Sequence, residues 1–274
     1  SISIKHPNLI TIPADSFSVN AFCDQYDIDL SKFTTRAIIE LPHPKWIPII
    51  DALKSKGAII AYDLIDEWDS KLGEGWYSQD IEKAIIDKSD VLTATAPVLK
   101  TKLEKFSYRD VHLLPNAVNL RLFDHRKKHP LPTDLPESDF VITYVGALYG
   151  DWFDWDLLIN IASTYYQANV IVIGDYREQC PKRLPNLKFL GLKPQTSLPA
   201  YLAYTDVAII PWKISEVTKA TSPLKVYEYL AMHVPVVAPD LPPLRYIPAV
   251  YLAESSDAFL MQIGKARTRI INPE

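Results

Sequence analysis

The sequence has few cysteines, few glycines and no long hydrophobic run, and each shortage excludes a class of protein. Only Cys23 and Cys180 occur among 274 residues, so we expect neither a disulfide framework nor a Cys/His metal site, and a reducing compartment is the default. No stretch approaches the roughly 20 apolar residues that span a bilayer, and the first residues lack the charged and apolar regions of a signal peptide. We therefore expect a cytoplasmic protein, with peripheral contact at the inner face of the membrane left open.

Charge and glycine spacing exclude two kinds of ligand. The net charge is -4, which argues against a nucleic-acid partner because phosphate backbones are bound through clustered Lys and Arg. The 8 glycines never form Gly-x-Gly-x-x-Gly, so a nicotinamide-dependent dehydrogenase is a poor candidate. A chain of 274 residues can bury a large core and form one large or two modest domains.

Short apolar runs alternate with helical spacing in the first half of the chain. Strands are expected at 8–12, 36–41, 58–62 and 90–94. Helices are expected at 46–56, 79–88 and 96–106. This βαβ order predicts a parallel sheet whose strands are buried on both faces. A proline-rich and charged segment, 120–139, is expected to link a first domain, 1–119, to a second, 140–274.

The second half repeats the pattern with a glycine after each of its first three strands. Strands are expected at 140–145, 169–173, 187–190, 207–210, 234–238 and 249–252. Gly146, Gly174 and Gly191 follow the first three. Ligands of open parallel sheets collect at the carboxyl ends of the strands, where glycines allow close approach. The sequence thus predicts a two-domain α/β protein with doubly wound parallel sheets and a ligand site on the second sheet.

The segment 221–240 carries the strongest chemical signal. Ser222 is a suitable helix N-cap and Pro223 suits the first helical position. Lys225 and Glu228, three apart on the expected helix, then share one face near the positive end of the dipole. The lysine and the helix N-terminus attract phosphate, and the carboxylate can accept hydrogen bonds from vicinal hydroxyls. A nucleoside diphosphate site is the sharper interpretation, and a surface ion pair is the alternative.

The same residues resemble the donor-binding signature of GT-B glycosyltransferases, especially bacterial cell-surface enzymes. The resemblance rests on Lys225-Val-Tyr-Glu228-Tyr-Leu-Ala-Met and the following Pro235-Val-Val-Ala. Four further segments fall in the family's order: Tyr62-Asp-Leu-Ile-Asp66, Ser89-Asp-Val-Leu-Thr-Ala-Thr, Leu114-Pro-Asn-Ala-Val-Asn119 and Tyr144-Val-Gly146. The resemblance implies two Rossmann-like domains, the first of them incomplete in this chain, and a nucleotide-sugar donor.

Roles for the donor site follow from the resemblance. Glu228 would bind the ribose hydroxyls, Lys225 would neutralise the diphosphate of the leaving group, and the turn Gly191-Leu192-Lys193 would contact the base. The other expected donor-binding residues are Gly146, Ala147, Gly174, Thr221, Ser222, Pro223 and Leu224.

Two departures from the family pattern stand beside these roles. Ala220 occupies the position eight residues before Glu228, where relatives carry a first acid. The chain after Gly146 also lacks the basic residues that many relatives place on the phosphates, which makes Lys213 and Lys219 secondary candidates. Because of both departures, the sequence leaves open whether the transferase retains or inverts the configuration of the transferred sugar.

A catalytic base is expected after the strand at 58–62. Asp66, or else Asp63, would deprotonate the acceptor hydroxyl, as an inverting transferase requires. A solvated acidic turn that caps the next helix is the alternative. His43, at the end of another strand, is a candidate for the acceptor site.

The sequence therefore predicts a glycosyltransferase that moves a sugar from a UDP- or GDP-sugar to an acceptor hydroxyl in cell-surface polysaccharide or glycoconjugate synthesis. The expected partners are the nucleotide sugar and a glycan or lipid-linked acceptor. No cofactor and no metal are expected, because Lys225 and the helix dipole take the place of Mg²⁺. A nucleotide-sugar epimerase of the same architecture and an inactive nucleotide-sugar-binding protein are the alternatives, and the base, sugar and acceptor stay open.

Overall fold

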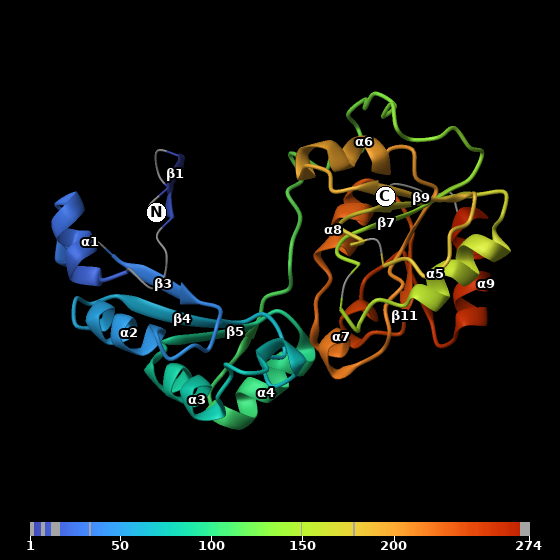
Figure 1. The fold of residues 1–274 in the computed structure, drawn as a ribbon. Helices are drawn as coiled ribbons and strands as arrows, with labels where there is room; N and C mark the ends of the chain where they lie inside the picture. The colour runs from blue at the N-terminus through green and yellow to red at the C-terminus, as the bar shows by residue number, and fades with distance from the viewer. Residues whose placement is uncertain are drawn as a thin grey trace. The chain divides into compact units, whose positions relative to one another are not determined.

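The computed structural model describes residues 3–6, 9–11, 17–32, 34–148, 150–177 and 179–268. The chain divides into two compact units, Ser1–Pro115 and Asn116–Glu274, and each has its own parallel sheet with helices packed on it (Figure 1). Within the described ranges, no helix is both long and apolar enough to cross a membrane.

The first unit contains a four-stranded parallel sheet in the order β3-β4-β5-β6. Its strands are β3 (Arg36–Ile39), β4 (Ile59–Leu64), β5 (Val91–Ala94) and β6 (His112–Leu113). Its helices are α1 (Val19–Tyr26), η2 (Leu30–Lys32), α2 (Trp46–Lys54), η3 (Lys71–Gly73), α3 (Gln79–Lys88) and α4 (Pro97–Ser107). α2, α3 and α4 lie on one face of the sheet (Figure 1). This confirms the predicted βαβ order.

The prediction that these strands are buried on both faces is wrong. Ile60 and Tyr62, whose side chains point to the helices, are fully buried, whereas Ile38 is 67% exposed and Ile59 is 42% exposed. Side chains alternate between the two faces of a strand, so helices on one face bury only every second residue. An apolar run of five residues carries no sign of this alternation, which is why the sequence pattern suggested burial on both faces.

The strand expected at 8–12 does not join the parallel sheet. Residues 8 and 12 lie outside the described ranges, and β2 (Leu9–Thr11) pairs antiparallel with β1 (Ser3–His6) in a separate two-stranded sheet. α1 follows, with the Ser18 hydroxyl accepting from the Ala21 N–H. Its end falls at Asp27, which adopts the left-handed conformation typical of a helix C-cap.

The second unit contains a six-stranded parallel sheet in the order β12-β11-β10-β7-β8-β9. Its strands are β7 (Val141–Val145), β8 (Asn169–Ile173), β9 (Leu187–Gly191), β10 (Val207–Ile209), β11 (Val236–Pro239) and β12 (Val250–Ala253). Its helices are α5 (Trp155–Thr164), η4 (Gln195–Ser197), α6 (Leu198–Leu202), α7 (Glu216–Ala220), α8 (Leu224–Ala231), η5 (Pro242–Leu244) and α9 (Ser256–Thr268). Every residue of β7, β10 and β11 is buried, as expected of a sheet covered on both faces.

Strand order places a topological switch point beside β7. The chain runs from β7 outward to β8 and β9, then returns to the other side of β7 and runs outward again through β10, β11 and β12. Connections leave in opposite directions at this point, and ligands of open α/β sheets bind in the crevice that results at the carboxyl ends. For this unit, the strand order therefore predicts a ligand site where β7 and β10 end.

The segment 120–139, predicted as a linker, contains no helix or strand and runs along the second unit. Phe123 is 1% exposed and Leu135 is 6% exposed, and both belong to the core of this unit. Asp134 accepts hydrogen bonds from Lys193 and from the Tyr201 hydroxyl. The segment is therefore fastened to the second domain by both apolar and polar contacts.

Candidate functional site

Three glycines stand next to one another where β7, β8 and β9 end. The Gly146 N–H donates to the Ile173 carbonyl and the Gly174 N–H donates to the Gly191 carbonyl, both at 2.9 Å. A Cβ atom on Gly174 would lie 1.9 Å from the Gly146 carbonyl oxygen. Gly146 and Gly174 have φ values of 149° and 154°, which side chains rarely permit. Bare backbone thus forms this edge of the sheet, and a ligand can approach it closely.

Lys225 lies at the switch point. It is the second residue of α8, and its side chain packs against Gly146. If Gly146 carried a Cβ atom, that atom would lie 2.5 Å from Lys225 Cε and 3.1 Å from Lys225 Nζ. Its Nζ is 4.9 Å from the centre of the Trp212 ring and 6.0 Å from that of the Tyr144 ring. Because Gly146 follows β7 and Trp212 follows β10, the ammonium group lies where these two strands end.

Burial lowers the pKa of Lys225 to about 8, an effect that the negative charge of Glu228 partly offsets. No described carboxylate lies within ion-pair distance of the ammonium, and the aromatic rings are its nearest favourable neighbours. A cation held out of water without an anion is energetically costly. The group is therefore prepared to gain from an anionic ligand that enters the crevice.

Buried hydroxyl groups fix the surroundings of Lys225. The Tyr229 hydroxyl, from α8, accepts from the Val145 N–H at 2.8 Å and ties the helix to the end of β7. Trp212 Nε1 donates to the Tyr144 hydroxyl, which donates to the Ala147 carbonyl at 2.8 Å. Burial raises the pKa of Tyr144, so the phenol stays neutral and keeps its role as a donor.

Glu228 lies one turn after Lys225 and is 6% exposed. Its Oε1 accepts from Gln195 Nε2, from η4, at 2.8 Å. No described residue donates to its Oε2. A carboxylate can accept about four hydrogen bonds, so this side chain keeps most of its capacity for hydroxyl groups of a ligand.

The start of α8 differs from the prediction by one position. The helix begins at Leu224, Pro223 takes the N-cap position with an extended backbone, and no side chain caps the first turn. The N-cap role predicted for Ser222 is therefore wrong: its hydroxyl lies 3.4 Å from the Tyr227 hydroxyl instead. Thr221 donates to the Val217 carbonyl of α7. The Val226 N–H donates to the Pro223 carbonyl at 3.0 Å, so an anion at the start of α8 would meet the backbone N–H groups of Leu224 and Lys225.

Sequence reasoning missed Asn116, whose Nδ2 donates to the Ser222 carbonyl at 2.7 Å. This bond holds the loop before α8 across a separation of 106 residues. An asparagine in the segment 114–119 was visible in the sequence, but nothing local indicates a contact with a loop so far along the chain.

The other expected cations are placed less favourably than Lys225. Lys193 pairs with Asp134 at 2.6 Å and Lys219 pairs with Glu216 at 2.9 Å. Lys213 is exposed. Leu192, in the turn expected to contact a base, is 76% exposed. Ala220 is fully buried, so the position of the missing first acid is filled by packing.

In the first unit, Asp63 and Asp66 differ in environment. Asp63, on β4, accepts from the Thr93 hydroxyl of β5 at 2.6 Å. Asp66 lies in the bend after β4, partly exposed, and its carbonyl accepts from the Trp68 N–H. His43 follows β3 and helps line an apolar hollow of about 320 Å³ together with Leu41, Lys45, Trp46 and Trp76.

A buried polar network beside Asp66 was not predicted. Glu82, 1% exposed on α3, accepts from the hydroxyls of Tyr62 and Tyr77 at 2.7 and 2.8 Å. Lys102 of α4 pairs with Glu67 and lies 3.6 Å from Glu82. These contacts join the loop after β4 to two helices. Each residue is visible in the sequence, but their contacts are not, because the residues come from separate segments that only the fold brings together.

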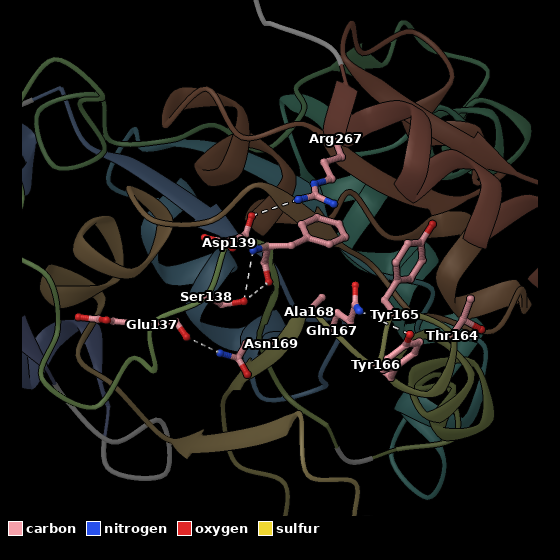
Figure 2. Close-up of a pocket in the computed structure, with 11 residues that line it drawn as sticks. Glu137, Ser138, Asp139, Thr164, Tyr165, Tyr166, Gln167, Ala168, Asn169 and Arg267 are labelled. Atoms are coloured by element: carbon pink, nitrogen blue, oxygen red, sulfur yellow. Dashed lines mark hydrogen bonds between the residues drawn. The ribbon is translucent and has the colours of Figure 1, made fainter.

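A second hollow, of about 620 Å³, lies at the opposite end of the second sheet. Figure 2 shows it lined by residues at the starts of β7 and β8, including Asp139 and Asn169, with Arg267 reaching over it. The Arg267 guanidinium stacks on the Phe140 ring at 4.1 Å and donates to the Asp139 carbonyl. These strands begin here, so the hollow is distinct from the glycine edge.

Comparison with known proteins agrees with this geometry. Residues 139–265 match the family described as glycosyl transferases group 1. TuaH of Bacillus subtilis (strain 168), named as a glycosyltransferase of teichuronic acid biosynthesis, is 26% identical over 226 residues. The match covers 76% of this chain and 56% of TuaH, so the chain spans about half the length of that relative.

Solved structures give the fold. Sucrose-phosphate synthase from Thermosynechococcus elongatus has a TM-score of 0.65 and 16% identity over 97% of this chain and 78% of its own. Alr3699/HepE from Anabaena, solved with UDP and glucose, has a TM-score of 0.64 and 15% identity over 91% and 71%. The two parallel sheets, the switch point and these structural matches show that the chain has the GT-B fold, and residues 139–265 of its second unit are similar to the glycosyl transferases group 1 family.

Proposed function

We propose that this chain is a glycosyltransferase that moves a sugar from a UDP- or GDP-sugar to an acceptor hydroxyl in cell-surface polysaccharide or glycoconjugate synthesis. The observation that carries the proposal is Lys225, a partly buried ammonium at the switch point of the segment that matches the group 1 family, with no carboxylate of the described residues paired to it. The name of TuaH and the UDP and glucose bound to HepE support the same reading.

In this proposal, the diphosphate lies over Gly146 and the start of α8. The backbone N–H groups of Ala147 and of the first turn of α8 donate to the phosphate oxygens, and Lys225 neutralises their charge. Charge grows on the diphosphate as the glycosidic bond breaks, so a fixed cation stabilises the transition state more than the ground state. Glu228 accepts from the ribose hydroxyls, and the turn after β9 holds the base.

The acceptor hydroxyl belongs to a glycan or to a lipid-linked molecule, and Asp66 removes the proton of this hydroxyl. Asp63, whose carboxylate accepts from the Thr93 hydroxyl, is the second candidate. The donor site needs neither cofactor nor metal in this proposal, because Lys225 and the helix N-terminus supply the positive charge.

Purified protein tests the proposal through ligand-induced stabilisation, because a ligand that binds only the folded state raises the melting temperature. UDP or GDP should raise Tm, Lys225→Ala should abolish the response and Glu228→Ala should weaken it. Lys265→Ala is the matched control, because Lys265 is an exposed lysine of α9 in the same unit and has no role in the proposed donor site. Equal responses in all four proteins would refute the donor site.

Turnover then separates the alternatives. A transferase releases UDP or GDP slowly from a UDP- or GDP-sugar even without acceptor, an epimerase changes the sugar without releasing the nucleotide, and an inactive binding protein does neither. The buried Ala220 in place of the first acid is the specific observation that keeps the inactive binding protein as the second candidate.

A further inference from the structure

Gln195 makes an unusual contact for a surface residue. It begins η4 and is exposed, yet its Nε2 donates to the Oε1 of the buried Glu228 at 2.8 Å. Only the nitrogen of the amide can donate to a carboxylate, so the orientation of the amide follows from chemistry. The two residues are 33 apart in the sequence, and their bond joins the segment after β9 to α8.

The segment that joins β9 to η4 is held at two residues, Lys193 and Gln195. Lys193 pairs with Asp134 at 2.6 Å, and the Tyr201 hydroxyl also donates to Asp134. Two residues later, Gln195 is tied to Glu228. Leu192 is 76% exposed. The segment is therefore fixed at two points, while Leu192, which precedes both of them, faces solvent.

We infer that Gln195 is a positioning residue that fixes the Glu228 carboxylate and thereby makes the site prefer ribose over 2′-deoxyribose. This inference rests on the proposed function, in which Glu228 binds the ribose. The last torsion of a glutamate side chain is broad, and one anchored oxygen restricts it. With Oε1 held by Gln195, Oε2 and the remaining lone pair of Oε1 stand side by side for two vicinal hydroxyls.

A 2′-deoxyribose offers only one of those two hydroxyls. A held carboxylate then loses one hydrogen bond in a buried place, and sites built to bind a hydroxyl reject ligands that lack it. A carboxylate that can rotate would instead turn its oxygens toward the remaining hydroxyl or toward water. Because Glu228 is held in place, the loss of one hydrogen bond lowers the affinity for 2′-deoxyribose relative to ribose. The donors that fit are therefore ribonucleotide sugars rather than deoxythymidine-linked sugars.

The experiment measures calorimetric affinities for UDP against 2′-deoxy-UDP and for GDP against 2′-deoxy-GDP, pairs that differ only at the 2′ position. Wild type should prefer the ribonucleotide by about 10- to 100-fold, from the usual strength of a hydrogen bond to a charged group. Gln195→Ala should lower this ratio to about threefold, mainly by weakening the ribonucleotide. Gln195→Lys, which keeps an N–H donor of similar reach, should preserve the ratio. Gln167→Ala is the control, because Gln167 lies in the hollow where β7 and β8 begin, at the other end of the strands (Figure 2).

The outcomes are distinct. If Gln195→Ala weakens both members of a pair by the same factor, or changes neither, the inference is wrong while nucleotide binding and the proposed function stand. A wild-type protein that binds UDP and 2′-deoxy-UDP equally also overturns the inference alone. If wild type binds none of the four nucleotides, the proposed function fails and the inference falls with it.

Discussion

The ammonium group of Lys225 faces the indole ring of Trp212, with 4.9 Å between Nζ and the ring centre. Both residues belong to the connection between β10 and β11: Trp212 lies in the loop after β10, and Lys225 lies at the start of α8. An aromatic face attracts a cation but supplies no full negative charge. Burial therefore dominates and lowers the pKa of Lys225 to about 8, which makes the proposed donor site sensitive to pH.

The affinity for UDP-glucose should fall as pH rises above 8. The diphosphate of this ligand does not titrate in this range, so the protonated fraction of Lys225 sets the apparent dissociation constant. With a pKa of about 8, that fraction falls about tenfold between pH 7 and pH 9, and affinity should fall by the same factor. Calorimetric titration at both pH values checks this. Lys225→Met should bind weakly with no such dependence, and a flat wild-type profile would contradict the role of Lys225.

The same pKa predicts an opposite effect on folding. The pKa of Lys225 lies below its ordinary value of 10.5, so between about pH 8 and 10.5 the unfolded chain binds more protons and the free energy of unfolding rises with pH. Lys225→Met should therefore be more stable than wild type below pH 8, by up to about 3 kcal/mol. The gap should close toward pH 10.5. Urea unfolding of both proteins across this range measures it, and a constant gap would show that the lysine is not desolvated.

Gly174→Ala should disrupt the glycine edge. The new Cβ would lie 1.9 Å from the Gly146 carbonyl oxygen, which is backbone and cannot move aside. The residue also has φ 154°, and both effects together should cost about 3 kcal/mol or more. Gly57→Ala is the control, since Gly57 has φ 80° but no atom within 4 Å of the added carbon, and it should cost about 1 kcal/mol. Equal losses in urea unfolding would contradict the close packing at this edge.

The strands of the second sheet were predictable because each signal is local. The run 140–145 followed by Gly146 gave β7 to within a residue, and Asn169–Ile173 was predicted without error. Lys225 and Glu228 were also recognisable, because a lysine and a glutamate three apart on one helix necessarily share a face. Strand positions and residue pairs within one helix can be predicted, because they depend only on residues that are neighbours in the sequence.

The partners of these residues were not predictable. Gln195 meets Glu228 only because η4 and α8 fold onto the same end of the sheet, and Glu82 meets Tyr62 only because α3 packs on β4. Side-chain pairing between elements depends on helix rotation and strand register, which no local pattern specifies. The exposed face of the first sheet, with Ile38, was missed for the same reason: its burial depends on what covers it.

Glu82→Ala should destabilise the first unit. It removes the acceptor for two tyrosine hydroxyls and leaves Lys102 with Glu67 alone. Loss of a buried charged acceptor should cost about 3 kcal/mol of unfolding free energy. Glu104→Ala is the matched control, because Glu104 pairs with Lys100 at the surface and should cost less than about 0.5 kcal/mol. Chemical unfolding measures both, and similar values would argue that the network adds little.

Asp66→Asn should separate donor binding from sugar transfer. The amide has the shape of the carboxylate but cannot accept a proton, so transfer to an acceptor should fall by about 100-fold or more. UDP affinity should stay within about twofold, because the donor residues all belong to the second unit. Asp63→Asn should affect transfer less, because Asp66 is the proposed base. Rates of UDP release with and without acceptor measure these effects. If Asp63→Asn abolishes transfer while Asp66→Asn does not, the base is Asp63, and the bend after β4 serves only to carry the chain toward η3.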